Sequence, residues 1–391
     1  MYLYRKKYNK AARTRQRTVP CLVPKGGDTM AGVEAKYRQV VEWVRDNIAN
    51  GTLKSGDRLM SEMELSEQFG VSRQTIRHAT GELVNEGLLT RVKGSGTYIG
   101  GAAVPALPKR EKTMTIAVVS TFYESYIFPD TLKGIERVLS KNDYVMQVTF
   151  TDNRLYREEA ILKSILEKDN IDGLIVEPAK SALPNPNLHY YEEIRRRNIP
   201  IIFFNVFYRD IDVPCVRIDD SKIAERATKV LIDSGHKKIA GIFKGDDGQG
   251  PLRYKGFLDA MIGAGLRANQ EKILWLDTPM TVNLEEVGDY LFKRLGDSTG
   301  VVCYNDQVAY QLIELALKRG LNVPEDLSVV GIDDSYLAGV GKVPFTSFEH
   351  PKELLGRKVA ENLLKMIENP TFDGNYLFDS EPVYRGSVKR I

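Results

Sequence analysis

The sequence of 391 residues predicts two unlike parts, a small winged helix-turn-helix followed by a larger two-lobed α/β domain. Residues 61–81 have the pattern of two short helices joined by a tight turn. From Met114 onward, short apolar runs typical of buried strands alternate with helical stretches. Such alternation indicates parallel sheets with helices on both faces. Roughly 280 residues are too many for one such sheet, so we expect two lobes.

The helix-turn-helix is predicted from capping and turn signals in residues 61–81. Ser61 would cap the first helix and form a capping box with Glu64, three residues later. Gly70 would make the turn, and Ser72 is a natural N-cap for the second helix. These signals fall at the ends of two segments with apolar residues at helical spacing, so both helices are expected.

A helix before this motif and a hairpin after it complete the predicted winged helix. Apolar residues at helical spacing predict the preceding helix over residues 37–48. Two short β-type runs predict a hairpin over residues 88–100. Its tip at Lys93–Ser95 can approach a phosphate closely, because glycine adds no side-chain bulk.

The second helix of the motif would present polar side chains that suit the major groove of DNA. Arginine can bond guanine through two hydrogen bonds, glutamine can bond adenine, and threonine can contact a phosphate or a thymine methyl group. For this segment taken alone, an ordinary helical hairpin with solvated charges is the alternative. The side chains concerned are Arg73, Gln74, Thr75 and Arg77.

Residues 36–99 resemble the DNA-binding domain of the GntR family of bacterial repressors. The resemblance lies in GDRLMSEMELSEQFGVSRQTIRHATGELVNEGLL and KGSGTYI, and it implies binding to double-stranded operator DNA. Met60 stands where the family usually has proline and Met63 where many members have a polar or basic residue, so Met63 is not expected to contact DNA. The implied DNA contacts are Ser72, Arg73, Gln74, Thr75, Arg77, Lys93, Gly94 and Ser95.

Charge is unevenly distributed along the chain. Residues 1–29 hold eight Lys and Arg against one acid, whereas the remainder carries 47 basic and 51 acidic residues. We expect residues 1–29 to be a disordered leader, or to result from an upstream start codon with Met30 as the natural start. A DNA-tracking arm is the alternative.

Composition along the chain predicts the domain boundaries. The winged helix would occupy residues 30–100, and the Gly-, Ala- and Pro-containing residues 101–113 would form a linker. The α/β domain would occupy residues 114–391. Its lobes are predicted at 114–218 plus 347–375, and at 219–346 plus 376–391.

The predicted strands of the α/β domain end in polar or acidic residues. Ligands of parallel α/β folds bind at the carboxyl ends of strands, so these residues are expected to meet at a binding site. The strand ends are Ser120-Thr121, Glu177, Asn205, Asn305-Asp306 and Asp333-Asp334.

No catalytic set can be assembled from the sequence. A metal site would need several carboxylates that converge on one cation. The pairs Asp219-Asp220, Asp246-Asp247 and Asp333-Asp334 are better explained as helix caps or as acceptors of hydrogen bonds from a polyol. No GxGxxG follows a strand and no GxxxxGK[ST] occurs, which disfavours nucleotide cofactors. His236 is best explained by a helix-to-strand turn, and no serine has a nucleophile-elbow context. We therefore expect no enzyme activity, no cofactor and no metal.

Residues 114–391 supply carboxylates, amides, arginine and aromatic rings, which suit a sugar. They resemble the LacI family effector domain, which is similar to type I periplasmic sugar-binding proteins. The resemblance lies in GHKKIAGIFKGDDGQGPLRYKGF, CYNDQVA, LSVVGIDDS and FTSFEHP. Glu177 is added because it ends a strand that would face the cleft. The implied sugar contacts are Glu124, Tyr126, Glu177, Asn205, Arg253, Asn305, Asp333 and Glu349.

A GntR-type domain joined to a LacI-type domain resembles the arabinose repressor family of Gram-positive bacteria. The stretch IDGLIVEPAKSALPNPNLHYYEEI is the most specific part of that resemblance. It implies a homodimer that leaves its operator when L-arabinose binds. Chemistry alone stops at a small neutral polyol, so another pentose or hexose is an alternative. A sugar sensor without DNA binding and a sugar-modifying enzyme are further alternatives.

The cysteines and the hydropathy pattern bear on localisation. Cys21, Cys215 and Cys303 are odd in number and scattered, as is typical of a reducing cytoplasm. No apolar run reaches the roughly 18 residues of a membrane span. The basic N-terminus is not followed by an apolar h-region, so a secretory signal is not expected.

Overall fold

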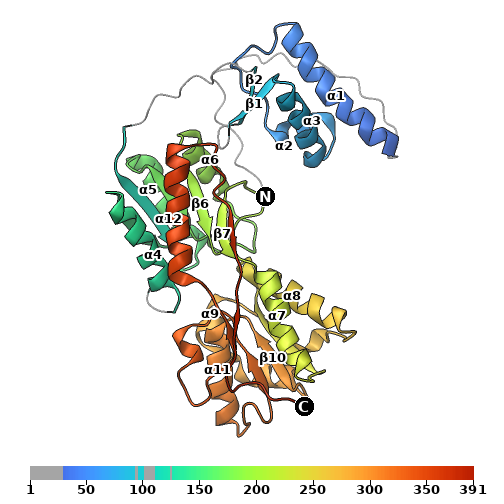
Figure 1. The fold of residues 1–391 in the computed structure, drawn as a ribbon, viewed down its shortest axis with the longest axis vertical. Coiled ribbons are helices and arrows are strands. Elements are labelled where there is room, and N and C mark those ends of the chain that lie inside the picture. The colour runs from blue at the N-terminus through green and yellow to red at the C-terminus, as the bar shows by residue number, and fades with distance from the viewer. Residues whose placement is uncertain (1–29, 93–95, 101–110, 124–125) are drawn as a thin grey trace, which may run out of the picture. The chain divides into compact units, whose positions relative to one another are not determined.

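The computed structural model describes residues 30–92, 96–100, 111–123 and 126–391 (Figure 1). The predicted leader, wing tip, most of the linker and Glu124 lie outside these residues. The described chain divides into two compact units, a small one up to residue 100 and a large one from residue 111. Among the helices described, none combines the length and apolar character needed to cross a membrane.

The first unit is a winged helix, as predicted. Ser61 caps α2 and forms the capping box with Glu64, and Ser72 caps α3 by accepting the backbone N–H of Thr75. Gly70 takes the left-handed conformation, with φ of 61°, that the turn between them needs. The elements are α1 (Met30–Ala49), α2 (Glu62–Phe69), α3 (Arg73–Asn85), β1 (Leu89–Val92) and β2 (Gly96–Ile99).

The three helices of the first unit share one apolar core. Val44 of α1, Leu65 of α2, and Ile76 and Leu83 of α3 are fully buried in it. The core fixes one face of α3 against α1 and α2, and therefore leaves the opposite face with Arg73 and Gln74 exposed.

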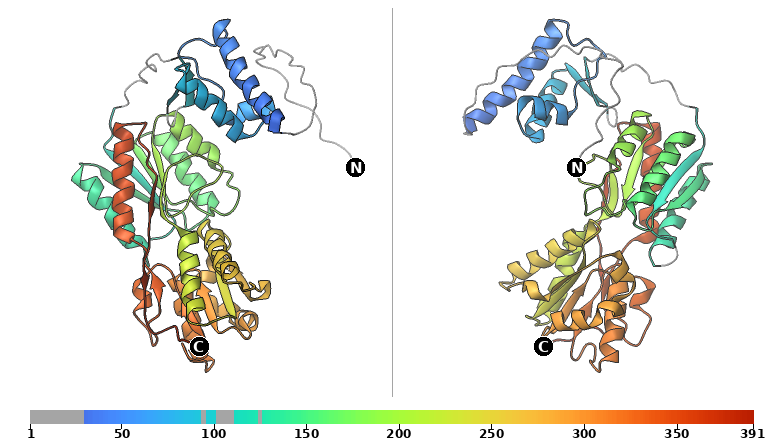
Figure 2. Two further views of the ribbon diagram at one scale, coloured as in Figure 1. Left: turned by 45° about the vertical axis from the view of Figure 1, so that its right-hand side comes forward. Right: turned by 180° about the vertical axis from the view of Figure 1, so that it is seen from behind.

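The second unit contains two parallel sheets, one in each lobe (Figures 1 and 2). The first sheet has the strand order β13-β7-β6-β5-β3-β4 and the second has the order β11-β10-β8-β9. The strands of the first are β3 (Thr115–Ser120), β4 (Val145–Phe150), β5 (Gly173–Val176), β6 (Ile201–Phe204), β7 (Cys215–Ile218) and β13 (Tyr376–Phe378). Those of the second are β8 (Ile239–Lys244), β9 (Ile273–Leu276), β10 (Gly300–Cys303) and β11 (Ser328–Val330).

Helices cover both faces of each sheet, as the alternating pattern predicted. In the first lobe, α4 and α12 pack on one face and α5 and α6 on the other. In the second lobe, α7 and α8 lie opposite α10 and α11. These helices are α4 (Phe128–Lys141), α5 (Leu155–Lys168), α6 (Leu188–Arg196), α7 (Asp220–Asp233), α8 (Gln249–Gly263), α10 (Gly288–Leu295), α11 (Asp306–Lys318) and α12 (Lys352–Glu368).

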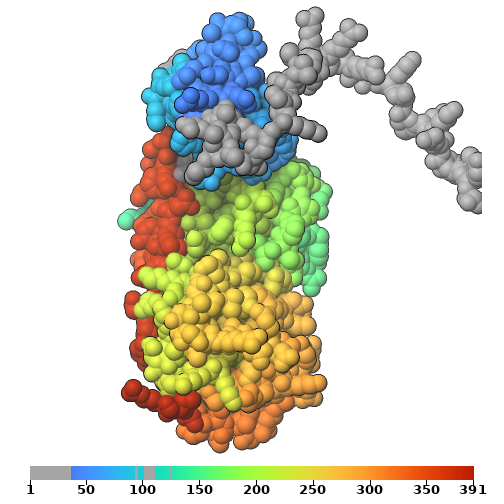
Figure 3. Space-filling view, turned by 90° about the vertical axis from the view of Figure 1, so that its right-hand side faces the viewer, coloured from blue at the N-terminus to red at the C-terminus, as the bar shows by residue number. Residues whose placement is uncertain are grey.

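The crossings between the lobes differ by a few residues from the predicted boundaries. Strand β13 was assigned to the second lobe, but it pairs in parallel with β7 and covers the edge of the first sheet. Residues 347–349 were assigned to the first lobe. Instead, β12 (Ser347–Phe348) pairs with β14 (Pro382–Val383), and Glu349 forms a bridge to Asp333 of the second lobe. Figure 3 shows α12 on the first lobe and the last residues of the chain on the surface of the second.

Candidate functional site

A cavity of about 300 Å³ lies between the two lobes of the second unit, where the carboxyl ends of both sheets meet. Its position agrees with the general rule for parallel sheets. The first lobe contributes Thr121, Phe122, Tyr123, Tyr126, Asn153 and Glu177, among others. The second contributes Lys244, Asp247, Gln249, Tyr304, Asn305, Gln307 and Asp333.

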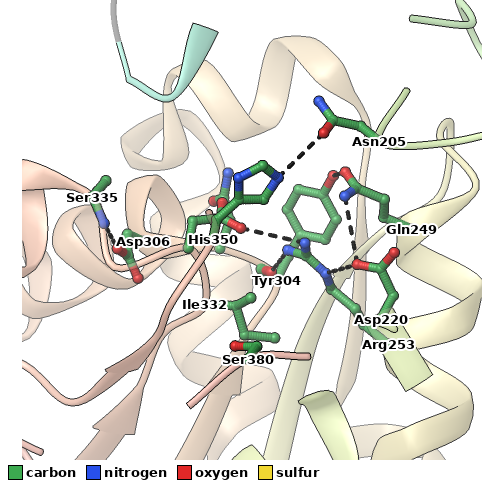
Figure 4. A network of polar contacts seen from close by, with 12 residues as sticks. Asn205, Asp220, Gln249, Arg253, Tyr304, Asp306, Ile332, Ser335, His350 and Ser380 are labelled. Atoms are coloured by element: carbon green, nitrogen blue, oxygen red, sulfur yellow. Dashed lines mark hydrogen bonds and ion pairs between the residues drawn. The ribbon is translucent and has the colours of Figure 1, made fainter. Parts of the chain in front are cut away.

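Arg253 of α8 lies behind the wall of the second lobe and is fully buried. Its Nε donates to Asp220 at 2.8 Å and its Nη1 donates to the carbonyl oxygen of Tyr304 (Figure 4). Its Nη2 lies 3.4 Å from Asp333. Burial raises the pKa of Asp220 to about 6, although Arg253 opposes the shift. The guanidinium thus connects the start of α7 with two strand ends, and it orients the Asp333 carboxylate that lines the cavity.

Tyr126 reaches from the first lobe across to the second. Its hydroxyl donates to the carboxylate of Asp333 and accepts the backbone N–H of Asp306 at 3.2 Å. Burial, with the negative charge of Asp333, raises the pKa of Tyr126 well above its ordinary value. The phenol therefore keeps its proton and closes one end of the cavity.

Glu177 follows β5 and presents its carboxylate at the wall of the first lobe. One oxygen accepts the backbone N–H of Thr121 at 3.0 Å and also its hydroxyl. The other accepts the side-chain amide of Asn205 at 2.7 Å. Burial raises the pKa of Glu177, and these donors oppose the shift. Asn205 therefore holds Glu177 in place. It is not among the residues that line this cavity.

The remaining predicted sugar contacts are placed differently from one another. Asn305 lines the cavity and also caps α11 by accepting the backbone N–H of Val308 at 3.0 Å. The side chain of Glu349 is exposed and is not part of the cavity wall, whereas the adjacent His350 is buried.

Three of the residues predicted for this site have left-handed backbone conformations. The φ angles are 75° for Tyr126, 61° for Asn205 and 112° for Asp333. Such conformations are unfavourable for residues other than glycine, and they cluster at binding sites where the surrounding structure holds them. This backbone strain is further evidence that the three residues belong to a binding site.

Lys244, Asp247 and Gln249 line the cavity but were not predicted as contacts. Lys244 ends β8, and its ammonium group lies 3.0 Å from Asp247. Burial alone would lower the pKa of Lys244, but Asp247 and Asp246 outweigh it and raise the pKa. The signal that could have identified them is their place at the carboxyl end of a buried strand, from the last residue of β8 to the first residue of α8. In the described part of the chain, no group of three His, Cys, Asp or Glu side chains could hold a metal.

The predicted DNA contacts of the first unit lie at the start of α3, the recognition helix. Arg73 and Gln74 are exposed, and the Ser72 hydroxyl lies 2.8 Å from that of Thr75. Arg77 pairs with Glu62 at 3.0 Å. Ser72 and Thr75 therefore stabilise the start of the helix, while Arg73 and Gln74 project from it.

Asp306, the first residue of α11, makes the stability of the folded protein depend on pH. Burial, together with the charge of Asp333, raises the pKa of Asp306 to about 8. Between about pH 4 and pH 8 the folded protein keeps this proton and the unfolded chain releases it, so stability falls as the pH rises. We expect Asp306→Asn to reduce the fall in melting temperature between about pH 5 and pH 8, measured by calorimetry. Asp259→Asn, at an exposed carboxylate of α8, is the control; an Asp306→Asn curve parallel to that of the unmodified chain would contradict the assignment.

Comparison with known proteins identifies both units. Residues 36–99 match the model of bacterial regulatory proteins of the gntR family, and residues 228–388 match that of a periplasmic binding protein-like domain. The structure is similar to a transcriptional regulator CelR–cellobiose complex, with a TM-score of 0.62, 22% identity, and coverage of 81% of this chain and 90% of the other. It is also similar to the transcription regulator CcpA of Lactococcus lactis, with a TM-score of 0.63, 24% identity, and coverage of 72% and 100%.

Two curated relatives extend over both units. The arabinose metabolism transcriptional repressor of Halalkalibacterium halodurans is 36% identical over 87% of this chain and 92% of its own length. The protein of the same name from Geobacillus stearothermophilus is 36% identical over 91% and 98%. The chain therefore belongs to the family of arabinose metabolism transcriptional repressors, with a GntR-type DNA-binding domain followed by a periplasmic-binding-protein-like domain.

Proposed function

We propose that this chain represses arabinose utilisation genes in the cytoplasm, binding operator DNA as a homodimer and leaving it when L-arabinose occupies the cavity between the lobes. The observation that carries the proposal is this cavity, whose polar walls come from both lobes. L-arabinose is chosen because two relatives at 36% identity are named for arabinose metabolism. The role requires neither a cofactor nor catalysis.

The chemistry of the cavity supports a neutral sugar over a phosphorylated one. Glu177, Asp247 and Asp333 supply carboxyl groups that can accept hydrogen bonds from adjacent hydroxyls and that would repel a phosphate. Lys244 in the same wall is already paired with Asp247. A volume of about 300 Å³ is at the lower end for small-molecule sites, which suits a monosaccharide.

We assign the sugar contacts to side chains that line the cavity. Tyr126, Glu177, Asn305 and Asp333 keep the role predicted for them, and Lys244 joins them as a donor. Asn205 and Arg253 act from behind the wall, where they hold Glu177 and Asp333. A sugar would thus bind side chains that other buried groups have already oriented.

The same contacts suggest how the sugar favours one arrangement of the lobes. Beside the cavity, the Asn153 amide donates to the Thr278 hydroxyl at 2.7 Å, and Lys180 pairs with Asp246, so each contact joins the two lobes. A sugar that needs both walls stabilises this closed arrangement. In this proposal the open arrangement is the one that binds the operator. Operator affinity therefore falls by the ratio of the sugar affinities of the closed and open states.

An electrophoretic mobility shift with a candidate operator tests the proposal. We expect saturating L-arabinose to weaken operator binding by about 5- to 150-fold, the usual range of such coupling. D-arabinose is the control. It is the mirror image of L-arabinose, so its hydroxyl groups cannot all meet the same side chains, and it should have little effect. Undiminished operator binding at saturating L-arabinose would overturn the induction claim.

Arg73 provides a separate test of the recognition helix. Arg73→Ala is expected to weaken operator binding by about 5- to 150-fold and to relax base preference, because a bidentate arginine contact discriminates between bases. Arg45→Ala is the matched control, since Arg45 is a surface arginine of α1 paired with Glu86. Competition with unrelated DNA measures specificity, and an equal loss of affinity for operator and unrelated DNA would contradict a base contact.

A further inference from the structure

His350 lies on the segment that leads from β12 of the second lobe to α12 of the first. Its side chain is buried, with 3% of the residue exposed. Nε2 lies 3.2 Å from the Asn205 side-chain oxygen (Figure 4). The amide nitrogen of Asn205 donates to Glu177 at 2.7 Å. Two consecutive hydrogen bonds therefore link this crossing segment to a carboxylate in the cavity wall.

The direction of these hydrogen bonds follows from the groups involved. Glu177 accepts from the N–H and hydroxyl of Thr121, so its carboxylate acts as an acceptor and faces the NH₂ end of the Asn205 amide. The oxygen end of that amide must then face His350. Because an amide oxygen can only accept, His350 Nε2 carries the proton.

The imidazole has only one proton to donate. Burial, with the positive charges of Lys352 and Arg253, lowers the pKa of His350 to about 3, so the ring is neutral near pH 7. Nδ1 has no hydrogen-bond partner among the described atoms. The single N–H of the ring is therefore committed to Asn205.

The same segment is also bound to the second lobe. The backbone N–H of His350 donates to the carbonyl oxygen of Asp333 at 3.2 Å. The Lys352 ammonium donates to the carbonyls of Asp333 at 2.7 Å and Asp334 at 2.8 Å. His350 thus connects the two lobes: its backbone N–H bonds to Asp333 of the second lobe, and its ring bonds to Asn205 of the first.

We propose that His350 is a positioning residue for the sugar: its N–H holds the Asn205 amide so that the NH₂ end faces Glu177 and the carboxylate presents its free acceptor sites to the cavity. Without this donor the buried oxygen of the Asn205 amide loses its partner, so the amide shifts toward another donor and its hydrogen bond to Glu177 weakens. The inference rests on the proposed sugar site, which His350 does not contact directly.

Calorimetric titration of the full chain with L-arabinose tests this role. His350→Leu removes the donor and is expected to raise Kd by about 5- to 150-fold, as for a buried polar group left without its partner. His350→Gln keeps an N–H donor and should recover most of the affinity. His236→Leu is the matched control, because His236 is also buried but bonds to Thr299 and to the carbonyl of Lys389; its Kd should stay unchanged.

A double-mutant cycle separates positioning from a general structural effect. In an Asn205→Ala background, His350→Leu should cause almost no additional loss of affinity, because the amide it orients is absent. Unchanged Kd in His350→Leu, or equal losses in both backgrounds, would overturn the inference. If the unmodified chain fails to bind L-arabinose, the proposed function fails instead.

The tautomer of His350 can be measured in the unmodified chain, whatever the folding of the variants. Nitrogen NMR of the chain with labelled histidine should show His350 as a neutral ring protonated at Nε2 at pH 7, assigned by loss of the signal in His350→Gln. A ring protonated at Nδ1, or a charged ring, would overturn the inference independently of the sugar.

Discussion

The buried guanidinium of Arg253 is the charge on which the second domain depends. Removing a cation from water into a protein interior costs several kcal/mol unless neighbouring charges and hydrogen bonds offset the loss of solvation. Asp220, Asp333 and the Tyr304 carbonyl provide that offset, and the Tyr304 ring lies 4.9 Å from the guanidinium. These groups come from the start of α7 and from the chain after β10 and β11, so one side chain holds Tyr304 and Asp333 of the cavity wall against α7. Removing one partner would leave buried charge uncompensated.

The influence of Arg253 extends to the first lobe through Asp333. The carboxylate that faces Arg253 on one side accepts the Tyr126 hydroxyl on the other. His350 connects the Asp333 backbone with Asn205, and Asn205 holds Glu177. The two carboxylates proposed to bind the sugar are therefore held by one connected network. Because these contacts are buried and coupled, a change at one wall is expected to affect the other.

Sequence reasoning located the cavity because the carboxyl ends of parallel strands must meet at one edge of a sheet. Glu177, Asn305 and Asp333 follow apolar runs directly, and they line the cavity together. The winged helix was equally accessible, since Ser61 and Ser72 are local capping signals. That Asn205, also at a strand end, would hold Glu177 instead of lining the cavity could not be predicted, because it depends on the packing of side chains around the cavity.

Long-range contacts set the limit of the sequence prediction. His350 contacts Asn205, which is 145 residues away, and no local pattern predicts that pairing. Glu349 was predicted to contact the sugar, but its side chain is exposed and the adjacent His350 is buried instead. Adjacent residues of an extended segment point to opposite sides, so an error of one position reverses the direction of the side chain. The lobe boundary near residue 375 was wrong for a related reason. The pairing of β13 with β7 is a tertiary contact made after the chain returns through α12.

The central claim is that L-arabinose binds between the lobes, held by carboxylates that Arg253, Asn205 and His350 orient. A crystal structure of the chain with L-arabinose tests it most directly. The account predicts one sugar per chain in the inter-lobe cavity, with hydroxyl groups within hydrogen-bond distance of Glu177 and Asp333. A sugar bound elsewhere, or an empty cavity at saturating L-arabinose, would contradict it.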